Sequence, residues 1–124
     1  MKPSEAFGSE TFAEMSDFGA IKRLIGPRKR HVVNNCESAR ELKQRPIDGD
    51  LEQLLDETRE KRDQLQQHLS VYQSLRTQLE EVAKNAGKKE YDKVMEDYDD
   101  YAELVLEAEQ LVVGLSSRME MIKD

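Results

Sequence analysis

Residues 89–122 read KEYDKVMEDYDDYAELVLEAEQLVVGLSSRMEMI, and this stretch decides the fold class. Apolar and aromatic side chains recur in it every three or four residues without exception, which is the period of one face of an α-helix. The stripe consists of Tyr91, Val94, Tyr98, Tyr101, Val105, Ala108, Val112, Leu115, Met119 and Ile122. We therefore predict one amphipathic helix from about Lys89 to Ile122.

A second long helix is predicted directly before it, from Leu51 to about Ala86. Asp50 is a suitable N-cap, and Gly87 is expected to end the helix as a left-handed glycine. The apolar stripe keeps a heptad register with three polar members, and it consists of Leu51, Leu55, Thr58, Arg62, Leu65, Leu69, Tyr72, Arg76, Leu79, Ala83 and Ala86. Two helices of similar length with a short connection form an antiparallel hairpin.

The first third of the chain is less regular. Gly26-Pro27 is expected to break the chain, and a shorter helix is expected from about Arg28 to Gln44, before Pro46. The predicted fold is all-α: a long, coiled-coil-like antiparallel hairpin with one short preceding helix. Residues 27–124 form the hairpin domain, and residues 1–26 form a flexible or docking segment that carries the start of a basic patch.

A hairpin of two thin stripes buries little apolar area, and a short third helix covers only part of it. We therefore expect the chain to complete its core by homo-oligomerisation or by binding another protein. The predicted association stripe consists of Leu65, Leu69, Tyr72, Leu79, Tyr98, Tyr101, Val105, Val112 and Leu115.

The 124-residue chain has a net charge of −7 that is unevenly distributed. Residues 1–47 carry nine basic and six acidic side chains, whereas residues 48–124 carry ten basic and twenty acidic ones. The basic patch consists of Lys22, Arg23, Arg28, Lys29, Arg30 and His31. It is interpreted as a solvated surface or an intramolecular partner of the acidic run at residues 96–109, as a contact for nucleic acid or an anionic membrane surface, or as a nuclear-import signal.

An acidic face is predicted near the middle of the last helix, and it consists of Glu96, Asp97, Asp99, Asp100 and Glu103. These carboxylates flank the tyrosine seam without replacing it. The simplest interpretation is a solvated surface; a site for a basic partner segment or for a metal ion is the alternative.

Aromatic residues mark the amino-terminal segment, which contains all three phenylalanines of the chain, Phe7, Phe12 and Phe18. Two interpretations stay open: a flexible tail with scattered apolar residues, or a docking segment whose aromatic side chains enter a groove on a partner.

No catalytic or cofactor-binding pattern is found in the sequence. One cysteine and two histidines fall on predicted helices without supporting motifs, so we expect no enzyme, no metal or other cofactor and no small-molecule substrate. Cys36 is expected to be buried in a reducing compartment. No signal peptide and no membrane span are predicted, which favours an intracellular protein, cytoplasmic or nuclear.

The run from about Gly26 to Met119 resembles the N-terminal helical region of Gag polyproteins from BEL/Pao-class LTR retrotransposons. The resemblance is carried by a basic start (Arg28-Lys29-Arg30-His31-Val32), an arginine-containing leucine-rich helix (Leu51, Leu54, Leu55, Arg59, Arg62, Leu65), the tract Tyr72-Gln73-Ser74-Leu75 with Leu79-Glu80, and an acidic helix with tyrosines (Glu96-Asp97-Tyr98 and Tyr101). It implies a non-enzymatic scaffold that self-associates or docks other proteins, in a eukaryotic cell.

Overall fold

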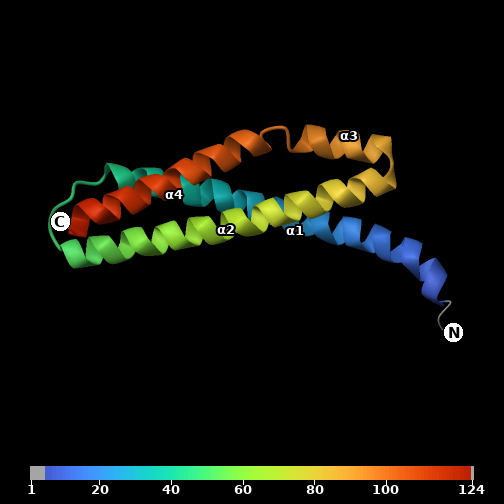
Figure 1. The fold of residues 1–124 in the computed structure, drawn as a ribbon, viewed down its shortest axis with the longest axis horizontal. Helices are drawn as coiled ribbons and strands as arrows, with labels where there is room; N and C mark the ends of the chain where they lie inside the picture. The colour runs from blue at the N-terminus through green and yellow to red at the C-terminus, as the bar shows by residue number, and fades with distance from the viewer. Residues whose placement is uncertain (1–4, 124) are drawn as a thin grey trace.

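The computed structural model describes the backbone of residues 5–123 and the side chains of residues 18–123. It contains four helices, α1 (Glu5–Gln44), α2 (Leu51–Ala86), α3 (Lys88–Asp97) and α4 (Tyr101–Lys123). Figure 1 shows α1 and α2 running antiparallel, with α3 and α4 returning along α2 in the opposite direction. The predicted all-α fold is confirmed, and α2 forms an antiparallel hairpin with the α3–α4 segment. None of the described helices is long and apolar enough to cross a membrane.

The predicted break at Gly26-Pro27 is wrong, because α1 continues through both residues. A proline inside a helix removes one backbone hydrogen bond and crowds the preceding turn. An apolar stripe that spans the predicted break offsets this cost by packing on the rest of the bundle. Its buried members are Ile21, Ile25, Val32, Cys36, Ala39 and Leu42.

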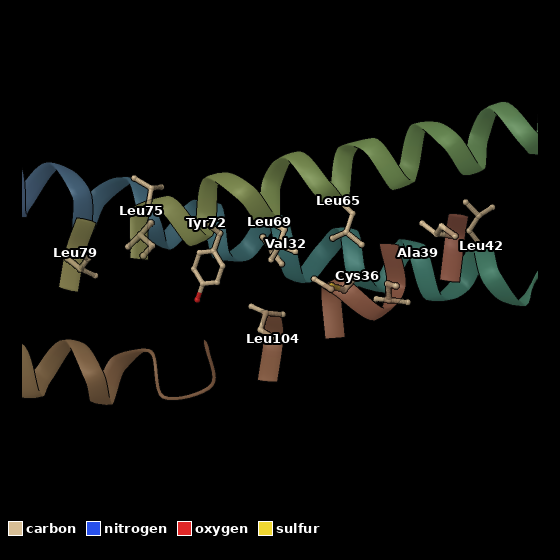
Figure 2. Close-up of a cluster of buried hydrophobic side chains, with 14 of the residues drawn as sticks. Val32, Cys36, Ala39, Leu42, Leu65, Leu69, Tyr72, Leu75, Leu79 and Leu104 are labelled. Atoms are coloured by element: carbon tan, nitrogen blue, oxygen red, sulfur yellow. The ribbon is translucent and has the colours of Figure 1, made fainter. Parts of the chain in front are cut away.

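The hydrophobic core lies where α1, α2 and α4 face one another. Figure 2 shows Val32 and Cys36 of α1 opposite Leu65 and Leu69 of α2, with Leu104 of α4 on the third side. Because α1 packs along both other helices, it takes the place that the sequence analysis left for a second chain. The core is therefore closed within one copy of the protein.

The ends of α2 follow the predicted capping residues. Asp50 Oδ1 accepts a hydrogen bond from the backbone N–H of Gln53 at 3.0 Å. Gly87 alone connects α2 to α3, with φ 124° and ψ 168°. The positive φ that was predicted is present, although the ψ value lies outside the left-handed helical region.

The prediction of one continuous helix over residues 89–122 is wrong, because residues 98–100 form a turn between α3 and α4. Carboxylates three and four residues apart repel one another along a helix, as Glu96 and Asp100 would. Acidic side chains are also unfavourable in a last helical turn, and α3 has no basic residue there. The same acids are favourable before the first turn of α4, so local electrostatics favours an interruption at this point.

Arg118 fixes the carboxyl end of α1, a role that the sequence analysis missed. Its guanidinium is buried and donates hydrogen bonds to the carbonyl oxygens of Lys43, at 3.0 Å, and of Arg45. The last carbonyls of a helix have no partner within the helix. Arg118 supplies two donors to this region, and α4 is thereby tied to the α1–α2 connection.

We expect Gly26→Ala to stabilise the protein by about 0.5–1 kcal/mol, because glycine is unfavourable inside a helix. A Cβ atom at Gly26 meets no other atom within 4 Å. Gly87→Ala is the matched control, since its φ of 124° makes any side chain strained. Urea unfolding should show opposite changes in the unfolding free energy, and equal destabilisation by both variants would contradict a helix through Gly26.

Candidate functional site

The predicted association stripe lies largely inside the chain. Five of its members are buried in the single copy: Leu65, Leu69, Tyr72, Leu79 and Leu115. The other four, Tyr98, Tyr101, Val105 and Val112, are half-buried and pack against the core. A second copy can therefore reach only the outer edge of this stripe.

That outer edge continues into a surface between α2 and α4, which we call the α2–α4 face. A groove of about 290 Å³ lies on it, with Leu69 and Val112 among its lining residues. Leu106 and Val113 are 56% and 65% exposed and lie seven residues apart, on the same side of α4. The face consists of Gln66, Leu69, Ser70, Gln73, Leu106, Glu109, Val112 and Val113.

The α2–α4 face is almost uncharged, in a chain of which 36% is charged. Residues 64–75 carry no formal charge, and Glu109 is the one charged residue of the face. The sequence signal for this surface is thus a gap in the charge pattern of the α2 segment. The apolar stripe alone does not indicate this surface, because Leu106 and Val113 lie outside the stripe.

The only two histidines of the chain meet on the opposite seam, between α1 and α2. The rings of His31 and His68 are stacked, with centroids 4.9 Å apart and an interplanar angle of 16°. Arg28 Nη1 lies 2.7 Å from Nδ1 of His68. The two helices therefore bring together a basic cluster from residues that are 40 positions apart in the sequence.

Lys61 extends this seam by about two turns of α2, since it lies seven residues before His68. Its Nζ donates hydrogen bonds to Oδ1 of Asn35 and to Oε1 of Gln64, both at 3.1 Å. Both acceptors are neutral amides, so the charge of Lys61 is not compensated by them. Neither Lys61 nor His68 was predicted as a site residue, because only their packing against α1 brings them to the basic patch.

The predicted basic patch does not form one surface. Successive residues of a helix differ by about 100° around its axis, so Lys22 to His31 encircle α1. Arg28 contacts α2, whereas Lys29 Nζ lies 2.9 Å from Asp100 and 5.4 Å from the ring centre of Tyr98. Lys22 Nζ lies over the Phe18 ring.

The predicted acidic face surrounds the α3–α4 turn. Glu96, Asp97, Asp99, Asp100 and Glu103 are all exposed. The Lys29–Asp100 contact joins this face to the basic patch, as the intramolecular interpretation predicts. An exposed pair of this kind contributes little stability, about 0–1 kcal/mol.

An aromatic and cationic cluster supports the turn from inside. The rings of Tyr72 and Tyr101 lie 5.4 Å apart, and the Arg76 guanidinium lies 5.0 Å from the Tyr101 ring centre. Arg76 donates hydrogen bonds to Glu80 at 3.0 Å and to the sulfur of Met95 at 2.9 Å. These contacts join α2 to both α3 and α4.

Tyr72 is fully buried, and its hydroxyl has no hydrogen-bond partner among the described residues. Figure 2 shows the hydroxyl pointing away from α2, on the side where Leu104 lies. Burial raises the pKa of Tyr72, and the nearby carboxylate of Asp100 adds to this effect. The side chain is thus a neutral core residue.

The predicted docking segment is divided by the structure. Phe18 is half-buried and packs against the core. Figure 1 shows the first turns of α1 extending past the connection between α2 and α3. The side chains of Phe7 and Phe12 lie outside the described residues, so their predicted docking role stays a prediction.

Comparison with protein-family models, with curated proteins and with solved structures finds no match for this chain.

We expect Tyr72→Phe to leave the unfolding free energy unchanged or to raise it by up to about 1 kcal/mol, since a buried hydroxyl without a partner is costly. Tyr72→Ala should lower it by about 3–5 kcal/mol, because the ring fills the core. Urea unfolding with circular dichroism measures both values. A loss of more than about 1 kcal/mol in the phenylalanine variant would show that the hydroxyl has a partner.

The stability of the protein should fall as the pH decreases below about 6.5, the ordinary pKa of histidine. Burial lowers the pKa of His68 in the folded chain, and the charges of Arg28, His31 and Lys61 lower it further. The unfolded chain therefore binds a proton at a higher pH than the folded chain, and the unfolding free energy decreases in that window.

His68→Gln tests this assignment, because glutamine does not titrate and still accepts a hydrogen bond from Arg28. Urea unfolding between pH 7.5 and pH 5 should show a smaller decrease in the variant than in the wild type. If the unfolding free energies of the wild type and the variant fall equally with pH, other titrating groups cause the decrease.

Proposed function

We propose that this protein is a non-enzymatic self-assembly module that forms dimers through the α2–α4 face. The observation that carries the proposal is the exposure of Leu106 and Val113 on the α2–α4 face, whose groove is almost uncharged. Exposed apolar side chains that gather around a groove are typical of protein-binding surfaces. A partner that covers these apolar side chains removes their surface from water, and this removal is the main favourable contribution to the free energy of association.

The low charge of the α2–α4 face supports a second copy of the chain as the partner. In a two-fold symmetric dimer each residue of the face meets the same set of residues in the other copy. Like charges on such a face would repel, and two chains of net charge −7 already repel each other as a whole. A face of glutamines, serine and aliphatic residues avoids this cost, and the amides can hydrogen-bond to one another.

The resemblance to the helical region of Gag polyproteins supports the same class of function, a scaffold that self-associates. The proposal includes an intracellular setting. The single cysteine of the sequence, Cys36, supports this part, because no disulfide can form within the chain.

The test measures the solution mass by light scattering at several protein concentrations and at two salt concentrations. The wild type should form a dimer that resists salt, because apolar contacts are not screened. Leu106→Asp and Val113→Asp should each shift the dimer to monomer while the helical circular dichroism is kept. A charge placed in a desolvated contact without a partner is costly.

Leu24→Asp is the matched control, because Leu24 is 58% exposed on α1, outside the α2–α4 face. This variant should dimerise like the wild type. A monomeric wild type at all concentrations, or equal effects of Leu24→Asp and Val113→Asp, would contradict the assignment of the interface.

A second candidate function is that of an adaptor that binds a different protein through the amino-terminal part of α1. The extension of α1 past the α2–α3 connection supports it, since a helix that leaves the bundle is accessible to a partner's groove (Figure 1). Deletion of residues 1–17 separates the two candidates. The adaptor loses partner binding in this variant, whereas the dimer formed by α2 and α4 is unaffected.

A further inference from the structure

The contact between Arg28 and His68 determines where the proton of His68 lies. A guanidinium group has only donors, so the Nδ1 atom that it approaches at 2.7 Å must be an acceptor. His68 is then neutral and carries its proton on Nε2. This arrangement holds only while the imidazole is neutral, because a protonated ring would direct a second donor at Arg28.

Only basic groups surround His68 on this seam. Arg28 and His31 approach it from α1, and Lys61 lies nearby on α2. The hydrogen-bond partners of Lys61 are neutral amides, and no ion pair joins a described carboxylate to Arg28, His31 or Lys61. Glu57 and Glu60 line the same groove as Lys61, about two to three turns of α2 away from His68. A chain of net charge −7 thus has a local concentration of positive charge around His68, between two helices.

We propose that Arg28, His31, Lys61 and His68 bind a tetrahedral oxyanion, a phosphate or sulfate group, and that binding strengthens when His68 takes up a proton. Arginine and lysine bind such groups through charge-assisted hydrogen bonds, which are stronger than neutral ones. This site lies on the α1–α2 seam and does not depend on the proposed dimer of the α2–α4 face.

The dependence on pH follows from the geometry of the pair. When His68 is protonated, the direct contact with Arg28 opens, because two donors face each other. An oxyanion placed between them accepts a hydrogen bond from each and replaces repulsion by attraction. By linkage, an anion that prefers the protonated ring must also raise the pKa of that ring.

The imidazole signals of the two histidines, followed by NMR between pH 5 and pH 8, measure this coupling directly. Sodium sulfate is the probe, since sulfate keeps its charge in this range, and sodium chloride holds the ionic strength constant. Saturating sulfate should raise the pKa of His68 by about one unit, equivalent to about tenfold tighter binding of sulfate to the protonated form.

Arg28→Ala should abolish the response of His68 to sulfate, and Arg30→Ala is the matched control with the same loss of charge. Arg30 has no contact with His68, so this variant should respond like the wild type. Circular dichroism confirms that each variant is folded at the lowest pH used. Inorganic phosphate at pH 7.5 should compete with sulfate for the same signals.

Three results would overturn the proposal. The first is a His68 pKa that sulfate leaves unchanged in the folded wild type. The second is an equal loss of response in Arg28→Ala and Arg30→Ala, which would indicate a diffuse effect of charge. The third is a single-stranded oligonucleotide that shifts the His68 signals equally in the wild type and in Arg28→Ala, which would indicate binding to the surface of α1 instead.

Discussion

The packing of α1 against the hairpin is the contact on which the rest of the structure depends. Val32, Cys36 and Ala39 lie between α2 and α4 and are almost fully buried. Each buried aliphatic side chain contributes about 1.5–3 kcal/mol, so the stripe outweighs the cost of Gly26 and Pro27 inside the helix. Because α1 occupies this position, the core needs no second chain, and the surface left for association moves to the outside of α2 and α4.

Electrostatics determines how the remaining surfaces differ. The acids at the α3–α4 turn stay in water apart from the Lys29–Asp100 contact, whereas Arg28, His31 and His68 face one another on the α1–α2 seam. The α2–α4 face carries almost no charge. One bundle therefore presents an acidic, a basic and a neutral surface, and the two proposals concern different ones.

The fold class, the cap at Asp50 and most of the α2 stripe were predicted correctly because they depend on local capping and on helical periodicity. Leu51 and Ala86, at the two ends of the stripe, are exposed. The continuity of α1 was not predictable from local signals, because packing against distant helices overrides the preference of Gly26-Pro27. The register of α4 was only partly predicted: Ala108, Leu115 and Ile122 are buried as expected, but Leu104 and Leu111 share the core with them. The stacking of His31 on His68 could not be predicted, because it depends on how α1 and α2 are aligned along each other, and no local sequence pattern specifies that alignment.

The most direct test of the central contact is the reactivity of Cys36 toward a thiol reagent such as DTNB. The thiol is 1% exposed between α1 and the hairpin, and the chain has no other cysteine. If α1 packs as described, labelling of the native protein should be at least about 100-fold slower than in guanidinium chloride, because it requires opening of the bundle. Labelling at nearly the same rate in both conditions would show that α1 does not cover the hairpin.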